Sequence, residues 1–366
     1  MHLSKTELTR YNKHIKLSEI GIQGQERLKA AKVLVIGAGG LASSVLLQLT
    51  AAGIGLIGLV DGANIEAKHL QTHFLFSETD LGASKAKTAA LTLKTQNPNI
   101  QFKVAQTWVS KENVLHLLEA FDVVVDCTDH FPTHYLLNDA CCIQKKPLVF
   151  SKLHQFKGQI SVLNLNGGPS LRCLFPEAPK EVVNPSEAGF LCVLPSLIGC
   201  MQANEVLKIV LEIMGVLNGK LLQLNILDYA LSIQEITKTE AVKISEMGNY
   251  ELKIAATNSV VPSSISAEVL SKMLHENSKL KILDVREYFE WDICHIKGAT
   301  NIPMNLIDEC IDEVSKDVPT VVLCHHGLRS LNVIHYLETK GYTNLINLEG
   351  GIHAWASRVE QGMATY

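Results

Sequence analysis

The sequence predicts an α/β protein in which a Rossmann-like domain with a mostly parallel sheet precedes a smaller α/β domain. Short apolar runs alternate with helix-like segments from residue 32 onwards, which is typical of a parallel sheet that helices bury on both faces. A weakly patterned stretch then interrupts this alternation, which starts again after it. We therefore expect a first domain over residues 1–236, a linker over 237–262 and a second domain over 263–366.

The expected strands are short runs rich in β-branched residues, and the expected helices are longer segments with helical periodicity. After helical residues 3–31, we expect a strand at 33–36, a helix at 41–52, a strand at 56–61, a helix at 85–94, strands at 100–109, 121–129, 145–150 and 158–165, a loop at 167–190, a long helix and a strand at 220–228. The second domain is expected to open with a helix at 265–274 and to contain strands within 279–287, 320–330 and 344–351.

Composition and charge argue against several classes of protein. The net charge of −4 does not favour a general nucleic-acid surface. The most apolar stretch, residues 197–217, is interrupted by amide and charged side chains, so we expect no membrane span. The amino terminus lacks a signal-peptide core, and the nine cysteines are odd in number and irregularly spaced. We therefore expect a protein of the reducing cytoplasm, without nucleic-acid or membrane partners.

A glycine-rich turn separates the first expected strand from the helix after it. Gly37, Gly39 and Gly40 fit the pattern in which glycines let the backbone approach phosphates at a helix N-terminus. Asp61 ends the next strand, where an acidic side chain bonds the hydroxyls of a ribose. The turn indicates nucleotide binding but does not distinguish NAD, FAD and ATP. An NAD-dependent oxidoreductase would explain this turn and no other motif.

The first domain resembles the MoeB/ThiF family of ubiquitin-activating-type adenylyltransferases, which charge small sulfur-carrier proteins. The resemblance covers about residues 5–235 and rests on the order and spacing of short motifs. These are RYNKHI (10–15), GQERL (24–28), VLVIGAGGLAS (33–43), DCTD (126–129), GQISV (158–162) and SEAG (186–189).

The resemblance implies that ATP binds at the glycine turn, with Gly40 near its phosphates and Asp61 on its ribose. Lys85 would contact the phosphates, and Asp129 would act in catalysis by holding Mg²⁺. The C-terminal carboxylate of a carrier protein would then attack the α-phosphate and expel pyrophosphate. The resemblance also implies a homodimer in which Lys13 reaches the neighbouring site.

Several positions depart from the family pattern. They are Lys13 (usually arginine), Ala63 (aspartate), His69 (asparagine), Thr72 (arginine) and His130 (asparagine, after the aspartate). Loss of an arginine removes a cation that would face a triphosphate, and a lysine does not reproduce its bidentate fork. If the enzyme is active, we expect replacement positive charge from Lys13, Lys68, His69, His73 and His130. His130 would keep a hydrogen-bonding role beside the nucleotide.

Two cysteine features of the family are missing. Of the paired zinc cysteines only Cys173 remains, with Ser170 at the partner position, and residues 235–262 contain no cysteine. We therefore expect no structural zinc. Pro185 stands where the family often has a cysteine before the SEAG motif, so we expect no carrier thioester or persulfide link at that point.

The second domain resembles a rhodanese domain over about residues 264–360, through segments 282–303, 321–330 and 348–355. Cys324 follows an apolar strand and precedes a helix, so backbone N–H groups and the helix dipole would favour its thiolate. The resemblance implies that Cys324 carries a persulfide, that Arg329 stabilises the anion, and that Asp284 and Arg286 support the neighbouring strand end. Four residues separate Cys324 from Arg329, which is the sulfur-transfer spacing, whereas related phosphatases have a wider loop.

Together, the two resemblances predict a two-step enzyme. It would adenylylate the C-terminal glycine of a small ubiquitin-like sulfur carrier of the MoaD or ThiS type and transfer sulfur through a Cys324 persulfide. Mg²⁺-ATP, a carrier ending in Gly-Gly, and a sulfur donor such as thiosulfate or a cysteine desulfurase persulfide are implied. The resemblance does not name the carrier, because molybdopterin and thiamine synthesis, tRNA thiolation, and cysteine or secondary-metabolite pathways all use this architecture. The alternative is a catalytically degenerate ThiF-like scaffold that carries an active rhodanese sulfurtransferase.

Overall fold

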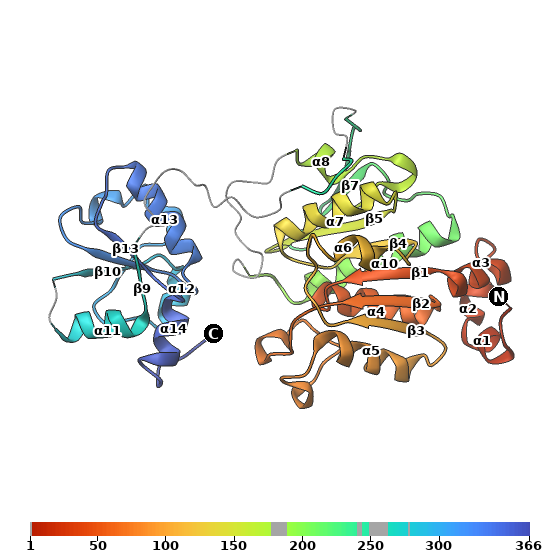
Figure 1. Cartoon of the computed structure of the whole chain (residues 1–366), viewed down its shortest axis with the longest axis horizontal. Coiled ribbons are helices and arrows are strands. Elements are labelled where there is room, and N and C mark those ends of the chain that lie inside the picture. The colour runs from red at the N-terminus through yellow and green to blue at the C-terminus, as the bar shows by residue number, and fades with distance from the viewer. Residues whose placement is uncertain (1, 177–188, 240–243, 249–262, 277–278) are drawn as a thin grey trace. The chain divides into compact units, whose positions relative to one another are not determined.

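The computed structural model describes residues 2–176, 189–239, 244–248, 263–276 and 279–366. The chain divides into two compact units, Met1–Ile254 and Ala255–Tyr366 (Figure 1). Most of the expected linker, Pro185 and the first three residues of the SEAG motif lie outside the described residues.

The first unit is an eight-stranded sheet covered by helices on both faces (Figure 1). Its strands are β1 (Lys32–Ile36), β2 (Leu56–Val60), β3 (Gln101–Ala105), β4 (Val123–Asp126), β5 (Leu148–His154), β6 (Lys157–Leu163), β7 (Lys220–Asn225) and β8 (Leu231–Glu235). Its α-helices are α1 (Lys5–Arg10), α2 (Asn12–Ile15), α3 (Gly21–Ala30), α4 (Gly40–Ala52), α5 (Lys85–Gln96), α6 (Val114–Leu118), α7 (Phe131–Ile143), α8 (Leu171–Leu174) and α10 (Val193–Leu211).

The strand order of the first unit is β3-β2-β1-β4-β5-β6-β7-β8. The first five are parallel, and β6, β7 and β8 continue the sheet as antiparallel strands. The strand order changes direction at β1: β2 and β3 are added on one side of β1, and β4 is added on the other. In such sheets, ligands bind beyond the carboxyl ends of the strands at this switch point, where the glycine turn follows β1.

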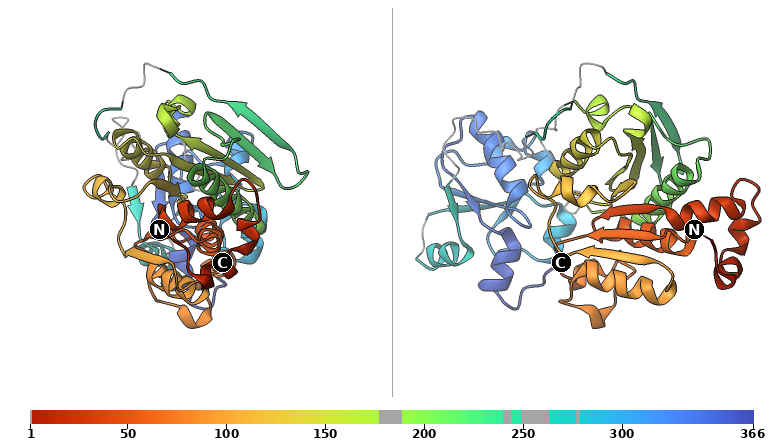
Figure 2. Two further views of the ribbon diagram at one scale, coloured as in Figure 1. Left: turned by 90° about the vertical axis from the view of Figure 1, so that its right-hand side faces the viewer. Right: turned by 45° about the vertical axis from the view of Figure 1, so that its right-hand side comes forward.

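The core of the first unit lies on both faces of the sheet because side chains alternate along each strand. In β1, Val33 and Val35 pack with α4, α5 and α10, whereas Leu34 and Ile36 pack with α6 and α7. The result is a three-layer α/β/α arrangement (Figure 2).

Helix α10 is the one described helix that is long and apolar enough to cross a membrane, with a mean hydropathy of 1.2 over its window. It packs closely against α4 at Gly199, where a Cβ would lie only 2.4 Å from the Leu41 carbonyl oxygen. Its Gln202 side chain is fully buried and donates to the Asp126 carbonyl oxygen at 2.8 Å. These contacts are those of a core helix that supports the sheet.

The second unit is a five-stranded parallel sheet with the order β11-β10-β12-β13-β9. Its strands are β9 (Ser263–Ile265), β10 (Lys281–Asp284), β11 (Thr300–Asn301), β12 (Thr320–Leu323) and β13 (Leu345–Leu348). Its α-helices are α11 (Ala267–His275), α12 (Tyr288–Ile293), α13 (Leu328–Thr339) and α14 (Gly351–Arg358). One face of the central strand β12 packs on α13 through Val322, and the other packs on α11 and α14 through Val321 and Leu323.

The sequence predictions of fold class and of a mostly parallel sheet are confirmed. Several details differ from the expected elements. The strand expected at 100–109 ends at Ala105, the loop expected at 167–190 contains the short helix α8, and β9 precedes the expected opening helix of the second domain. Strand β8 was not predicted, because its five residues are all exposed and show no buried face.

Gly37 is conformationally required where β1 leads into the glycine turn. Its φ is +94°, and a Cβ there would lie 2.8 Å from the Cys127 carbonyl oxygen. We expect Gly37→Ala to lower the free energy of unfolding by about 3 kcal/mol, because backbone strain adds to the clash. Gly82→Ala is the matched control, since Gly82 has φ +81° with no atom within 4 Å of its Cβ position, and it should cost only about 1 kcal/mol. Equal losses in urea denaturation would contradict the role of the Cys127 contact.

Candidate functional sites

The glycine turn after β1 is held in place by the carboxylate at the end of β2. The amide of Gly37 donates to the Val60 carbonyl oxygen at 2.8 Å. Asp61 accepts from the Ala38 amide through Oδ2 and from the Ala63 amide through Oδ1, both at 2.7 Å. Asp61 therefore fixes the shape of the turn as well as standing at the predicted ribose position.

The N-terminus of α4 is approached closely by two other segments. A Cβ on Gly40 would lie 3.1 Å from Pro195 Cβ and 3.3 Å from Thr72 Cβ, and one on Gly39 would lie 3.5 Å from His73 Nε2. A side chain at Gly40 would have to displace these neighbours, whereas the contact at Gly39 is an ordinary van der Waals distance. With glycine at both positions, no side chain covers the backbone N–H groups of the turn. This is a cradle of the kind that accepts phosphate oxygens.

Lys85 supplies a buried positive charge beside this cradle. It begins α5 and is only 7% exposed, and burial lowers the pKa of its ammonium although Asp61, Glu66 and Asp129 act against this shift. Glu66 pairs with Lys68 at 2.9 Å, and Asp61 bonds the backbone. Among the described residues, no carboxylate lies within 4 Å of the Lys85 ammonium. Burying a cation without a close counter-ion costs free energy, and a bound anion would offset this cost.

Asp129 and His130 are exposed at the loop after β4, on the side of the sheet that carries Lys85. His130 forms the N-cap of α7, and its Nδ1 lies 3.0 Å from Thr133 Oγ1. Asp129 lies near enough to Lys85 to act on the pKa of the lysine. The structure therefore brings Gly37, Asp61, Lys85 and Asp129 to one edge of the sheet.

A buried aspartate–histidine pair, which the sequence analysis missed, supports this loop. Asp126 is fully buried, and its Oδ2 lies 2.7 Å from His134 Nδ1. Its Oδ1 accepts from the amide of Thr128 at 3.0 Å and from the Thr128 hydroxyl at 2.7 Å. The available signal was an aspartate at the end of an otherwise apolar strand, followed eight residues later by a histidine on a helix.

The expected replacement of positive charge by histidines is not supported. Burial is the main cause that lowers the pKa of His69, and repulsion from the Lys85 charge adds to it. The same two causes lower the pKa of His73 to about 3. Partial desolvation also lowers the pKa of His130, although its side chain is exposed. These imidazoles are neutral near pH 7, so Lys85 carries the charge at the cradle. The sequence could not reveal this for His69 and His73, because their burial depends on the fold of the segment between β2 and α5.

Lys13 is not brought to the cradle of its own chain. Two residues before it, the Tyr11 ring lies against Gly53, whose Cβ position is 2.7 Å from Tyr11 Cζ. Gly53 caps the C-terminus of α4, about 20 Å along that helix from Gly40. Lys13 therefore lies near the opposite end of α4 and is exposed.

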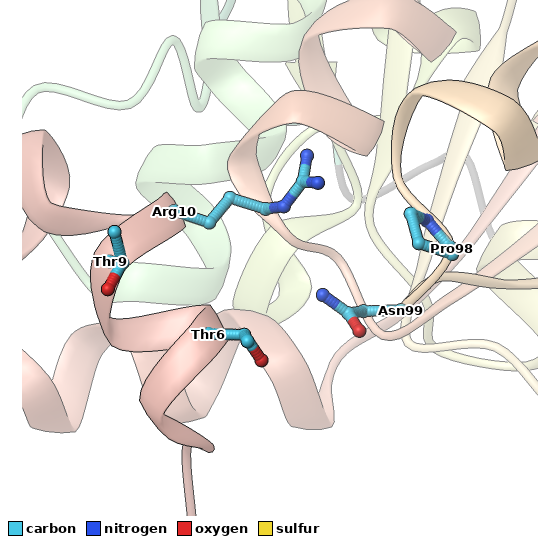
Figure 3. A pocket seen from close by; sticks show the side chains of 5 residues that line it. All are labelled: Thr6, Thr9, Arg10, Pro98 and Asn99. Atoms are coloured by element: carbon cyan, nitrogen blue, oxygen red, sulfur yellow. The ribbon is translucent and has the colours of Figure 1, made fainter.

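A surface pocket of about 470 Å³ lies near this opposite end, lined by Thr6, Thr9, Arg10, Pro98 and Asn99 (Figure 3). The Arg10 guanidinium donates to the Gln96 carbonyl oxygen at 3.0 Å. The pocket contains none of the predicted site residues.

Ser170 and Cys173 stand where the family has a pair of zinc-binding cysteines. Ser170 Oγ lies 3.6 Å from Cys173 Sγ.

The second site is the loop between β12 and α13. Cys324 is 1% exposed, and its Sγ accepts from the Gly327 amide at 3.1 Å. Ser330 Oγ, on the first turn of α13, lies 3.6 Å from the same sulfur. Gly327 has φ +97°, and a Cβ there would lie 3.1 Å from the Leu348 carbonyl oxygen. The turn therefore aims the Gly327 amide at the sulfur, which stabilises negative charge on it, whereas the Ser330 hydroxyl donates to Asn347 Oδ1 at 2.7 Å.

Arg329 is engaged by a carboxylate that the sequence analysis missed. Its Nη1 and Nη2 each lie 2.7 Å from an oxygen of Glu290 on α12. Burial alone would lower the pKa of Arg329, but the hydrogen bonds and charge of Glu290 raise it overall. Anion stabilisation by Arg329 stays a prediction, because the structure gives its guanidinium a bidentate partner already.

The last residue of the chain joins this network. The Tyr366 hydroxyl donates to Glu290 Oε1 at 2.9 Å and accepts from Arg286 Nη1 at 2.7 Å. Arg286 is fully buried, and its Nε bonds Asp284 Oδ1 at 2.9 Å, as the resemblance implied for a supporting pair. No periodicity or motif indicated Glu290 or Tyr366.

Comparisons with known proteins agree with this division of the chain. Residues 11–247 match the model of the ThiF family, and residues 266–358 match that of the rhodanese-like domain. A relative named "Probable adenylyltransferase/sulfurtransferase MoeZ", from Mycobacterium tuberculosis, is 34% identical over all of this chain and 96% of its own length. A relative named "Adenylyltransferase and sulfurtransferase MOCS3", from Aedes aegypti, is 32% identical over all of this chain and 90% of its own length.

A solved structure shares the fold. The crystal structure of E. coli MccB with MccA-N7isoASN matches with a TM-score of 0.58 and 21% identity, over 66% of this chain and 75% of that one.

The ion pair between Arg329 and Glu290 should make the second unit sensitive to acid. Burial raises the pKa of Glu290, but the hydrogen bonds and charge of Arg329 outweigh this and lower it below its ordinary value of 4.5. A carboxylate with a lowered pKa in the folded state stabilises that state above its unfolded pKa and loses this effect as the pH falls through the folded pKa. We expect Glu290→Gln to cost about 2 kcal/mol at neutral pH, with the difference from wild type shrinking below about pH 4.5.

The measurement is urea denaturation of the full chain across this pH range, monitored by a probe in the second unit. Glu309→Gln, at an exposed position of the same unit, is the control and should stay within about 0.5 kcal/mol of wild type. A Glu290→Gln effect that does not change between neutral and acidic pH would contradict the charge-based account.

Proposed function

The chain belongs to the ThiF family and carries a rhodanese-like domain, and from this premise we propose that it adenylylates a carrier carboxylate and then delivers sulfur to it. The acceptor would be the C-terminal glycine of a small ubiquitin-like sulfur carrier. The observation that carries the first step is the buried Lys85, which has no carboxylate within 4 Å among the described residues and lies beside the glycine cradle.

The cradle fits the polyphosphate of ATP. A Cβ at Gly40 would contact Thr72 and Pro195, so glycine keeps this space free of a side chain. The N-terminus of α4 directs its N–H groups and the positive end of its dipole at the same space. Lys85 would neutralise phosphate charge, and Asp61 would hold the ribose while keeping the turn in shape. Asp129 would hold Mg²⁺, which would supply further neutralisation of the phosphates.

In this arrangement, the first step is in-line attack of a carrier carboxylate oxygen on the α-phosphorus, with pyrophosphate as the leaving group. The chain's residues position the reactants and stabilise charge, and none of them needs to form a covalent bond. The product is an acyl-adenylate, whose carbonyl carbon is far more reactive toward a sulfur nucleophile than a free carboxylate.

The second step is assigned to Cys324. A sulfane sulfur taken from a donor such as thiosulfate or a cysteine desulfurase would form a persulfide on Cys324. The Gly327 amide that faces Sγ would stabilise the anion. The outer sulfur of the persulfide would attack the activated carbonyl carbon and expel AMP, which leaves the carrier on Cys324 as an acyl disulfide. An external thiol would then reduce the S–S bond, so that the carrier leaves as a thiocarboxylate and Cys324 is left in a disulfide with that thiol.

A second function remains to be tested against the first. Neutral His69 and His73, together with Thr72, leave the cradle with fewer cations than the family pattern provides. This favours a scaffold in which only Cys324 is chemically active. The two functions differ in one measurement, which is carrier-dependent exchange of pyrophosphate into ATP.

We further propose a homodimer and a reducing compartment for this enzyme. Lys13 lies far from its own cradle, so it could act only in a neighbouring chain. All nine cysteines are free thiols, as a cytoplasmic sulfur-transfer protein requires.

Lys85 should be required for adenylylation. We expect Lys85→Met to lower pyrophosphate exchange, measured with a MoaD- or ThiS-type carrier, by about 100-fold, because the buried charge beside the phosphates is lost. Lys87→Met is the matched control on the exposed side of the same helix and should stay within about twofold of wild type. Exchange by the wild type that survives in Lys85→Met would rule out the assigned role. Absence of exchange by the wild type with every such carrier would support the scaffold.

Cys324 should be required for sulfur transfer alone. We expect Cys324→Ser to abolish thiocyanate formation from thiosulfate and cyanide while pyrophosphate exchange is retained, since the two sites lie in different units. Cys310→Ser is the control, because burial and neighbouring carboxylates raise the pKa of that thiol and disfavour its thiolate. Sulfur transfer that persists in Cys324→Ser would contradict the assignment.

A further inference from the structure

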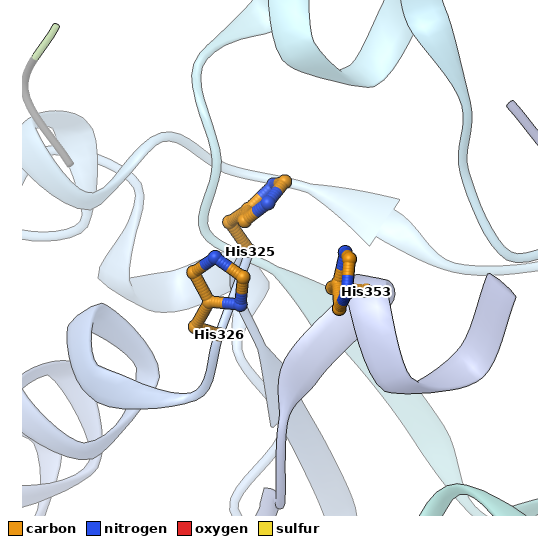
Figure 4. Close-up of side chains that lie close together, drawn as sticks. All are labelled: His325, His326 and His353. Atoms are coloured by element: carbon orange, nitrogen blue, oxygen red, sulfur yellow. The ribbon is translucent and has the colours of Figure 1, made fainter. Parts of the chain in front are cut away.

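Three histidines gather beside the Cys324 loop, and the sulfur-transfer chemistry does not use them. His325 and His326 follow Cys324 directly, and His353 lies on the first turn of α14 (Figure 4). One ring nitrogen from each lies within 4.8 Å of the other two. The ring centroids of His325 and His326 are 4.1 Å apart, and that of His353 lies 5.1 Å from His326 and 5.8 Å from His325.

The backbone holds the two contributing segments together. The Ile352 amide donates to the Cys324 carbonyl oxygen at 2.9 Å, and the His353 amide donates to that of His325 at 3.2 Å. Gly351 permits this approach, because it has φ +56° and a Cβ there would lie 2.2 Å from the Cys324 carbonyl oxygen. The convergence of the rings is therefore built into the fold and does not depend on a chance meeting of mobile side chains.

We propose that His325, His326 and His353 form a three-histidine site for a divalent transition-metal ion of the Zn²⁺ class. Imidazole nitrogens are preferred ligands of Zn²⁺, Co²⁺, Ni²⁺ and Cu²⁺. Tetrahedral coordination with bonds near 2.0 Å requires nitrogens about 3.3 Å apart. The three ring nitrogens lie within 4.8 Å of one another, so side-chain rotations that shorten these distances by at most about 1.5 Å complete the site. His326 and His353 are exposed, so the fourth coordination position is open to water or a small ligand.

The ring nitrogens favour a cation here over an anion. His325 Nδ1 is buried and has no hydrogen-bond partner in the described part of the chain, so an imidazole lone pair is available to a metal ion. An anion site would need protonated histidines instead. Arg329 is a cation close enough to act on His325. Glu290 balances the charge of Arg329 at 2.7 Å, so the arginine repels a bound metal ion only weakly.

The site would be distinct from the sulfur-transfer centre but coupled to it. Its first two ligands are the residues that follow Cys324, and the next residue along the chain, Gly327, donates to the Cys324 sulfur. A bound ion would tie this loop to α14 through side chains in addition to the two backbone hydrogen bonds. The proposal does not depend on the adenylylation step.

The test is titration of the untagged full-length chain with Co²⁺ in the presence of a thiol reductant that does not bind metals. We expect visible absorption bands of four-coordinate Co²⁺ that saturate at one equivalent and disappear when Zn²⁺ is added. No near-ultraviolet thiolate-to-cobalt band should accompany them, which separates this site from the nine cysteines. The spectra report on binding alone, so sulfurtransferase activity is not needed as a readout.

His326→Gln and His353→Gln should each weaken Co²⁺ binding by about 100-fold or more, because each removes one of three ligands. His275→Gln, at an exposed histidine on α11, is the matched control and should leave the affinity unchanged. Far-ultraviolet circular dichroism should be the same for all variants. Absence of saturable binding by the wild type, or binding that both His326→Gln and His353→Gln leave intact, would overturn the proposal.

Discussion

Both candidate sites depend on one backbone constraint, a sharp turn from a buried parallel strand into a helix. Gly37 has φ +94° after β1, and Gly327 has φ +97° before α13. At each turn, a Cβ would meet a carbonyl oxygen of a neighbouring segment, Cys127 or Leu348. The strand supplies rigidity, and the helix N-terminus supplies N–H groups for negative charge. In the proposed function, the two units would use the same kind of turn for two chemistries, with phosphates at the first turn and sulfur at the second.

The charged side chains around the two turns are arranged in opposite ways. In the first unit, Lys85 is buried and none of the surrounding carboxylates forms an ion pair with it among the described residues. In the second, Arg329 is balanced by Glu290, which Tyr366 also bonds. The first arrangement leaves a positive charge for a polyphosphate to neutralise. The second leaves the Gly327 amide to stabilise the sulfur, and it makes Arg329 part of the support that joins α12 to the loop.

The sequence was informative where local pattern decides structure. The glycine turns and the parallel strands follow from motifs and apolar runs, and the structure contains them. The supporting role of Asp284 and Arg286 was implied by the rhodanese resemblance, and the structure places the two side chains in contact. What could not be predicted depends on contacts between distant segments. The pKa of His73 is set by burial that only the folded chain creates, and Glu290 reaches Arg329 across 39 positions of sequence. The fully exposed strand β8 has no buried face, so it lacks the alternation by which strands are recognised.

In the proposed function, the first unit would remain a nucleotide site despite its departures at His69 and Thr72. Calorimetric titration of the purified chain with Mg²⁺-ATP measures this binding and needs no knowledge of the carrier. We expect saturable binding of one nucleotide per chain, weakened at least tenfold by Asp129→Ala because Mg²⁺ coordination is lost. No heat of binding at millimolar ATP would contradict the claim and leave Cys324 as the chain's chemical centre.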